Sequence, residues 1–121
     1  MNCKGRENMT VLDLYNNLEL KLLTNEHNLE REICDIYTGD LLSWVMSKAK
    51  KDDVWITVMG NINVAAVAVL TDVSCIIIAE NSSPDEDFIK RAIREEIPVF
   101  SSKEPSAKLI LQINKIMSLN Y

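Results

Sequence analysis

The longest apolar stretch of the chain covers residues 61–80 and is divided by a polar tetrad at residues 71–74. Apolar residues in its first half recur at steps of three and four, which predicts a buried helix over residues 62–70. The face that this spacing turns inward consists of Ile62, Ala66, Val69 and Val73. The second half, residues 75–79, is a short apolar run typical of a strand buried on both faces of a parallel sheet. A hairpin of two strands remains the alternative, because the valines of the first half also favour strands.

A membrane span is the competing interpretation of residues 61–80, since about 20 predominantly apolar residues cross a bilayer as a helix. Asp72 would then lie inside the hydrocarbon, where a carboxylate costs about 2.5–3.5 kcal/mol. The stretch also ends at Glu80 without a basic flank. We therefore predict that it forms the centre of a folded core and that the protein is not a membrane protein.

Helices and strands alternate along the rest of the chain. Strands are predicted at residues 20–23, at 32–38 with an interruption at Asp35, at 54–58 and at 99–101. Helices are predicted at residues 11–18, 41–49, 84–97 and 105–117. Two helix starts carry capping signals: Thr10 with Asp13 forms a capping box, and Ser83 precedes Pro84 at the first helical position. This order predicts an α/β fold with a mostly parallel central sheet of about five strands flanked by helices.

Length and charge narrow the class of protein. A chain of 121 residues predicts one domain, residues 1–121, with residues 1–9 as a flexible N-terminus. The formal net charge is −5 and no Lys/Arg-rich tract occurs, whereas nucleic-acid binders usually carry a basic patch. Nucleic acid is therefore not an expected partner. The first ten residues contain no apolar run typical of a signal peptide, so we expect a cytoplasmic protein.

Residues that commonly carry catalysis are scarce. The single histidine, His27, lies in a polar stretch and is expected to be an exposed loop residue. Glycine occurs only at positions 5, 39 and 60, so neither a phosphate-binding P-loop nor a dinucleotide-binding motif can be written. No His, Cys or carboxylate cluster has metal-ligand spacing. The acidic groups at 52–53, 85–87 and 95–96 are expected to be solvated or at helix ends. We predict no catalytic residue, no metal and no cofactor.

Small polar residues and glycines follow four of the predicted strands. In open parallel sheets, ligands bind beyond the carboxyl ends of the strands, next to helix starts whose free N–H groups favour anions. We therefore expect a ligand site at this edge. The candidate residues are Tyr37, Thr38, Gly39, Asp40, Gly60, Asn61, Asn63, Glu80, Asn81, Ser82, Ser83, Ser101, Ser102 and Lys103. Ordinary caps and tight turns use the same residue types and remain the alternative.

The aromatic residues divide between core and candidate site. Trp44 and Trp55 fall on predicted apolar positions and are expected to pack in the core. Tyr37 lies beside the candidate site, where its ring could stack on a ligand or cover the end of the sheet.

Six short elements between residues 37 and 102 carry a family resemblance. They are GDLLS at 39–43, WIT at 55–57, NVA at 63–65, III at 76–78, EEIPV at 95–99 and SS at 101–102. Together they resemble the small stand-alone bacterial members of the DRTGG domain family. A weaker likeness extends to both terminal helices, so the resemblance covers most of the chain.

The resemblance implies an α/β domain that is non-catalytic, frequently a homodimer, and suspected of binding a small ligand or a partner. Such domains also form the regulatory middle part of long phosphotransacetylases, and their fold is similar to the N-terminal domain of HPr kinase/phosphorylase. The catalytic P-loop of that kinase has no counterpart in this sequence, so kinase activity is not expected.

Two departures from the family pattern concern the residues after which it is named. Asp40 is followed by Leu41 instead of arginine, and the strand exit that corresponds to Thr-Gly-Gly reads Ala-Glu-Asn-Ser at residues 79–82. If these elements bind a phosphate in other members, this chain lacks the phosphate-binding residues, and a different ligand or none is expected.

Two functional hypotheses follow. In the first, the chain is a regulatory module that senses a small metabolite or nucleotide at the carboxyl ends of the strands and signals to a partner protein. In the second, it is a ligand-free dimerisation or adaptor module for a redox or signalling enzyme.

Overall fold

The computed structural model describes residues 9–119, which form seven strands and five helices. The strands are β1 (Met9–Thr10), β2 (Lys21–Leu22), β3 (Glu32–Ile33), β4 (Asp35–Thr38), β5 (Asp53–Thr57), β6 (Cys75–Ile78) and β7 (Val99–Ser101). The helices are α1 (Val11–Asn17), α2 (Leu42–Lys48), α3 (Ile62–Thr71), α4 (Glu86–Arg94) and α5 (Ser106–Leu119).

The main sheet has five strands in the order β2-β7-β6-β5-β4. Strands β4 to β7 run parallel, and β2 joins the edge of β7 antiparallel. The short strands β1 and β3 pair separately. The prediction of an α/β fold with a mostly parallel sheet of about five strands is confirmed.

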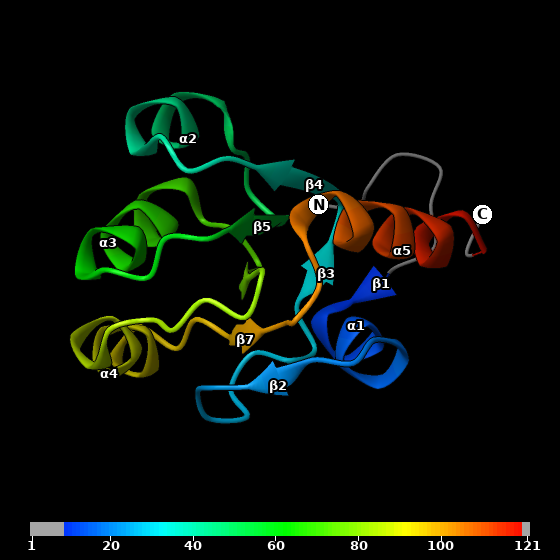
Figure 1. Cartoon of the computed structure of the whole chain (residues 1–121), viewed down its shortest axis with the longest axis horizontal. Coiled ribbons are helices and arrows are strands. Elements are labelled where there is room, and N and C mark those ends of the chain that lie inside the picture. Colours follow the sequence, from blue (N-terminus) through cyan, green and yellow to red (C-terminus); the bar gives the residue numbers. More distant parts are fainter. Residues whose placement is uncertain (1–8, 120–121) are drawn as a thin grey trace.

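Helices cover both faces of the main sheet (Figure 1). Helices α1 and α5 pack on one face through residues such as Leu14 and Leu109. Helices α2, α3 and α4 pack on the other through residues such as Val64 and Phe88. All four residues of β6 are buried and alternate between these two cores, which explains its uninterrupted apolar run.

The stretch at residues 61–80 forms helix α3, a turn and strand β6, so the hairpin alternative is wrong. No helix within residues 9–119 is long and apolar enough to cross a membrane. Asn61 caps α3 by accepting a hydrogen bond from the backbone N–H of Asn63 at 2.9 Å. Asp72 ends the helix in the left-handed conformation, φ 59°.

The buried face of α3 differs from the predicted one. Val64, Ala65 and Ala68 are buried, whereas Ile62 and Val69 are 43% and 44% exposed. Nearly every position of this helix is apolar, so periodicity could not distinguish its faces. The contacts of α3 with α2 and α4 on its two flanks decide the orientation instead.

Helix α2 is also more exposed than predicted. Only Val45 of this helix is buried, and Trp44 is 59% exposed with the Lys48 ammonium 5.0 Å from its ring centre. The prediction that Trp44 packs in the core is wrong, because α2 contacts the rest of the domain along a narrow strip. Trp55 is fully buried, as predicted.

Two element boundaries need correction. The predicted strand 32–38 is two strands, because β3 pairs with β1 and β4 enters the main sheet. Helix α4 begins at Glu86 with Asp85 as its N-cap, rather than at Pro84 after Ser83. The backbone N–H of Asp85 donates to the carbonyl of Gly60 at 2.7 Å, which holds the preceding segment against the exit of β5.

Of the segment 1–9 predicted to be flexible, only Met9 is described, and it lies buried in β1. Residues 1–8 lie outside the described part of the chain.

Candidate functional site

The carboxyl ends of β4 to β7 lie at one edge of the main sheet, because these four strands run parallel and in register. The four polar segments that follow them therefore share this carboxyl edge. The structure separates the candidate residues into those whose polar groups bond within the domain and those that line an open groove.

The exits of β5, β6 and β7 are joined by hydrogen bonds. The Ser82 hydroxyl donates to the carbonyl of Val58 at 3.1 Å. The backbone N–H groups of Glu80 and Asn81 donate to the carbonyls of Glu104 and Ser102 at 2.9 and 2.8 Å. These polar groups stabilise the turns, as the alternative of caps and turns predicts.

Hydrogen bonds also join the exit of β4 to that of β5. The Asp40 carboxylate accepts hydrogen bonds from the Thr57 hydroxyl at 2.7 Å and from the Val58 N–H at 3.0 Å. The carbonyl of Gly39 accepts from the Trp55 indole at 3.0 Å. Asp40 therefore ties the end of β4 to that of β5 through Oδ1.

A groove of about 740 Å³ opens at the β7 end of the carboxyl edge. Its walls are the connection from α1 into β2, the exits of β6 and β7, and the first turns of α5. The lining residues are Asn17, Leu18, Glu19, Leu20, Lys21, Asn81, Ser101, Ser102, Lys103, Glu104, Leu109 and Gln112. This volume lies within the usual range for sites of small ligands, about 300–1,000 Å³.

The groove contains four of the predicted candidates, Asn81, Ser101, Ser102 and Lys103. The remaining ten do not line it; they are Tyr37, Thr38, Gly39, Asp40, Gly60, Asn61, Asn63, Glu80, Ser82 and Ser83. Sequence reasoning missed the opposite wall, which includes Lys21 and Gln112. The antiparallel pairing of Lys21 with Ser101 brings that wall to the carboxyl edge, and no signal in the sequence indicated the direction of β2.

The turn beside the groove has an unusual backbone. Glu80 and Asn81 adopt positive φ angles of 58° and 55°, a left-handed conformation that costs roughly 1–2 kcal/mol for a residue with a side chain. Their N–H groups complete the turn against residues 102–104. The strained turn therefore places Asn81 at the groove by means of backbone hydrogen bonds.

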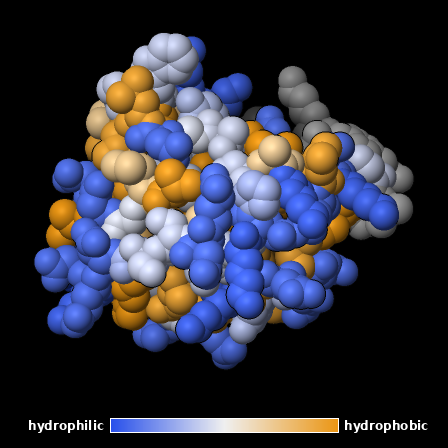
Figure 2. Space-filling model, in the orientation of Figure 1, coloured by the Kyte–Doolittle hydropathy of each residue, from blue (hydrophilic) through white to orange (hydrophobic). Residues whose placement is uncertain are grey.

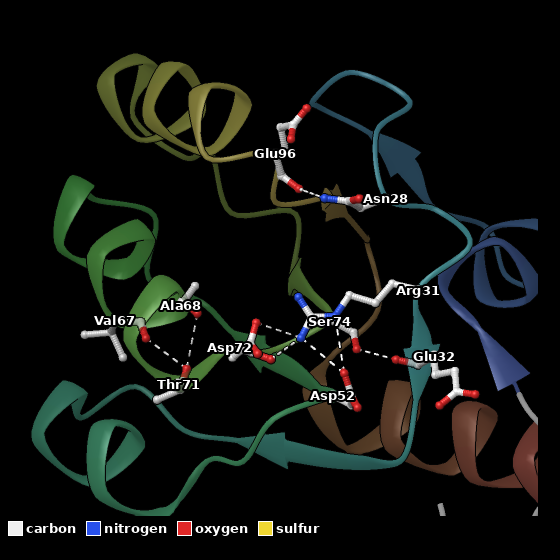
Figure 3. A network of polar contacts seen from close by, with 10 residues as sticks. All are labelled: Asn28, Arg31, Glu32, Asp52, Val67, Ala68, Thr71, Asp72, Ser74 and Glu96. Carbon is white, nitrogen blue, oxygen red and sulfur yellow. Dashed lines mark hydrogen bonds and ion pairs between the residues drawn. The ribbon is translucent and has the colours of Figure 1, made fainter. Parts of the chain in front are cut away.

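A second polar cluster lies at the opposite, amino-terminal edge of the sheet (Figure 3). The Arg31 guanidinium forms ion pairs with Asp52 at 3.1 Å and Asp72 at 2.9 Å and also donates to the carbonyl of Asp72. The Ser74 hydroxyl donates to the carbonyl of Glu32. These contacts join the segments that precede β4, β5 and β6.

The acidic pair at residues 52–53 was predicted to be solvated or at a helix end. Both residues are buried instead: Asp52 is 9% and Asp53 5% exposed. Burial is the main cause that raises the pKa of Asp53, and the charges of Asp35 and Asp52 add to it. The N–H of Lys50 donates to the Asp53 carboxylate at 2.8 Å and opposes this shift. Asp53 is accordingly a structural acceptor at the start of β5.

Two other possible sites of chemistry are the single histidine and a metal-binding cluster. His27 is an exposed loop residue 3.7 Å from Glu96, as predicted. Within residues 9–119, no group of three or more His, Cys, Asp or Glu side chains is arranged to hold a metal ion.

Comparison with known proteins places the chain in a family context. The model of the DRTGG domain matches residues 13–116, and a comparison with curated proteins gave no match. A similar solved structure contains the CBS and DRTGG domains of the regulatory region of Clostridium perfringens pyrophosphatase, complexed with its activator diadenosine tetraphosphate. It aligns with a TM-score of 0.65 at 17% identity, over 89% of this chain and 50% of that one.

At that identity the likeness concerns the fold, and the chain spans half the length of the solved structure. The match to the DRTGG domain confirms the resemblance stated from the sequence. The match to a DRTGG domain agrees with the prediction that the chain is not an enzyme.

Proposed function

Because the chain belongs to the DRTGG domain family, we propose that it is a regulatory module that binds a small metabolite or nucleotide in the groove at its carboxyl edge and signals occupancy to a partner protein. The observation that carries this proposal is the groove itself, where four predicted residues meet lining residues from α1, β2 and α5. A cytoplasmic location is part of the proposal.

The similar solved structure supports a regulatory role without identifying a ligand for this chain. It is a regulatory region in complex with a nucleotide activator, and it contains CBS domains in addition to the DRTGG domain. The ligand of this chain therefore has to be found by direct measurement.

The test combines native mass spectrometry of the purified protein with thermal unfolding against a panel of metabolites and nucleotides. A ligand present at about 100 times its Kd stabilises the folded state by about 2.7 kcal/mol, which raises Tm by several degrees. The double variant Asn81→Ala, Lys103→Ala should lose this rise. The matched control Asn63→Ala changes an exposed asparagine of the same edge that lies outside the groove and should keep it.

Two results would contradict this proposal. If no compound raises Tm and no bound mass is detected, the sensor hypothesis is wrong. If the Asn81, Lys103 variant responds like the wild type, the ligand binds elsewhere.

The exposed face of α2 favours the second candidate function, a homodimer or an adaptor for a partner enzyme. Leu41, Trp44 and Met46 are 61%, 59% and 50% exposed, and hydrophobic atoms reach the surface over this helix (Figure 2). Leu41 and Trp44 are three residues apart and therefore neighbours on the helix surface, and adjoining exposed apolar side chains often mark a protein–protein contact.

Light scattering after gel filtration tests this candidate. If α2 mediates association, Trp44→Lys should give a smaller species than the wild type. The control Leu111→Lys changes a leucine of α5 that is 69% exposed and should leave the mass unchanged. A wild-type protein that is monomeric at all concentrations would exclude self-association through α2.

A further inference from the structure

Two lysines line the groove although the whole chain is acidic. Lys21 lies in β2 and Lys103 in the segment that follows β7, and both residues line the groove. Within residues 9–119, the ammonium group of neither lysine has an ion-pair or hydrogen-bond partner. Two ammonium groups without counter-charges attract an anion.

The carboxylates of the groove only partly offset these lysines. Glu104 is held by the Lys108 ammonium at 3.0 Å and accepts a hydrogen bond from the Gln112 amide at 3.4 Å. Its charge is therefore compensated by a residue outside the groove. Of the two lining carboxylates, exposed Glu19 has no cation partner among the described residues. With Glu104 offset by Lys108, the groove has two ammonium groups against one carboxylate.

Neutral donors lie next to the lysines. The Ser102 side chain is buried, with the residue 4% exposed, and its oxygen accepts from the Glu104 N–H at 3.0 Å. Its O–H donates to no described residue. The Asn81 side-chain amide is likewise without a partner there. Hydroxyl and amide donors beside a cation suit the oxygens of a carboxylate or phosphate.

None of the twelve lining residues, all of them within residues 9–119, is aromatic. Recognition of nucleotides usually relies on a ring that stacks on the base, and here only Leu18, Leu20 and Leu109 supply apolar surface. Glu19, Asn17 and Gln112 instead offer polar groups that suit hydroxyls.

We propose that the groove binds a small phosphorylated or carboxylated metabolite that carries hydroxyl groups and no aromatic ring. Its anionic group binds Lys21, Lys103 and Ser102, and its hydroxyls face Glu19 and Gln112. This inference rests on the proposed function and narrows its ligand from metabolites and nucleotides to sugar phosphates and hydroxy acids.

Calorimetric titration of the full chain with five probes tests the class. Glucose 6-phosphate carries hydroxyls and phosphate, gluconate carries hydroxyls and carboxylate, and glucose carries hydroxyls alone. AMP and inorganic phosphate complete the set. We expect glucose 6-phosphate or gluconate to bind more tightly than glucose, AMP and phosphate, and the better of the two identifies the anionic group.

The test variant carries two substitutions, Lys21→Gln and Lys103→Gln. The control variant is Lys115→Gln, which changes an exposed position of α5 outside the groove. Loss of two charged hydrogen bonds should weaken binding by about tenfold or more in the double variant, with no change in the control. Equal binding by the double variant would place the anion elsewhere and overturn the proposal.

Two further outcomes separate this inference from the function on which it rests. If AMP binds in the groove more tightly than both hydroxylated anions, the ligand class is wrong while the regulatory module stands. If none of the probes and no compound of the wider panel binds, both are overturned.

Discussion

Gly60 lies directly against Pro84 where the chain leaves β5. A Cβ atom at position 60 would be 2.5 Å from the Pro84 Cα and 2.8 Å from its Cβ. At Gly39 the nearest atom would be Cε2 of the Tyr37 ring, at 3.2 Å, and that ring can shift slightly. The two glycines therefore differ in the space that the fold leaves for a side chain.

We expect Gly60→Ala to lower the free energy of unfolding by about 2–3 kcal/mol, because backbone segments must separate to admit the methyl group. Gly39→Ala should cost less than about 1 kcal/mol. Urea denaturation of both variants measures the difference. Equal losses of unfolding free energy in the two variants would mean that the close approach of Pro84 is not the reason for a glycine at position 60.

Asp53 makes stability depend on pH. Since burial raises its pKa in the folded protein, the folded state binds the proton more tightly than the unfolded chain does. Ionised Asp53 is therefore a cost to stability above its folded pKa. The cost disappears as the pH falls below 3.8, the ordinary value of the unfolded group.

Asp53→Asn keeps an oxygen that can accept the Lys50 N–H and removes the buried charge. We expect this variant to have a higher Tm than the wild type at pH 7. The difference should shrink as the pH is lowered toward 3.8. A lower Tm at pH 7 would show that the ionised carboxylate is needed for its hydrogen bond to Lys50.

At the scale of elements, the helix starts differ in how they are capped. In α1 the Thr10 hydroxyl accepts from the Asp13 N–H at 3.3 Å, and the Asp13 carboxylate accepts from the Thr10 N–H at 2.8 Å. Helix α4 has no side-chain cap, although Asp85 stands at its N-cap. The capping box of α1 was correctly predicted. The helix start predicted at Ser83 and Pro84 was wrong, because α4 begins at Glu86.

Thr10→Ala should therefore lower the free energy of unfolding by about 1 kcal/mol. Asp85→Ala removes only a charge near the helix start, and should cost about 0.5 kcal/mol or less. Thermal unfolding followed by circular dichroism compares the two. A larger loss at Asp85 would contradict the assigned caps.

The sequence pattern predicted where helices and strands lie better than it predicted which side of each helix is buried. Strand β7 was predicted at its observed residues, and β6 to within one residue, because buried β-branched runs bounded by polar turns have few alternatives. The buried face predicted for α3 and the predicted burial of Trp44 in α2 were wrong, because both helices carry more apolar residues than the rest of the domain covers. Which of them is buried depends on the packing of the other helices.

At the scale of the whole molecule, Arg31 joins chain segments that are far apart in sequence. Its partners Asp52 and Asp72 precede different strands, and the Asp52 side chain is only 12% exposed. Removal of the guanidinium would leave a nearly buried carboxylate without its donor. Arg91, by contrast, pairs with Glu95 within one helix.

We expect Arg31→Ala to reduce the free energy of unfolding by about 1–3 kcal/mol. Arg91→Ala should change it by about 0.5 kcal/mol or less, as is usual for surface pairs within a helix. Denaturant titration distinguishes them. Similar values would mean that the cluster in Figure 3 adds no more than a surface pair.

The candidate site could be predicted only in part from the sequence. Parallel strand order places the exits of β4 to β7 at one edge, and this predicted Ser102, Lys103 and Asn81. The bonds that engage Asp40 and Ser82 depend on neighbouring strands and could not be read from residue type. The wall formed by β2 and α5 required the direction of an edge strand, which tertiary packing decides.

The position of β2 has a consequence for how the domain moves. This strand has two residues, pairs with β7 alone among the described strands, and contributes to one wall of the groove, whereas β6 lies at the centre of the sheet. Short edge strands open locally, and central ones exchange their amide hydrogens only through larger unfolding. A ligand that bridges Lys21 and Lys103 would slow amide exchange at residues 21–22, where local opening breaks its contacts, as well as at residues 75–78, where global unfolding releases it. The signal of such a domain would then be a loss of conformational entropy in one edge strand, transmitted without any change of shape.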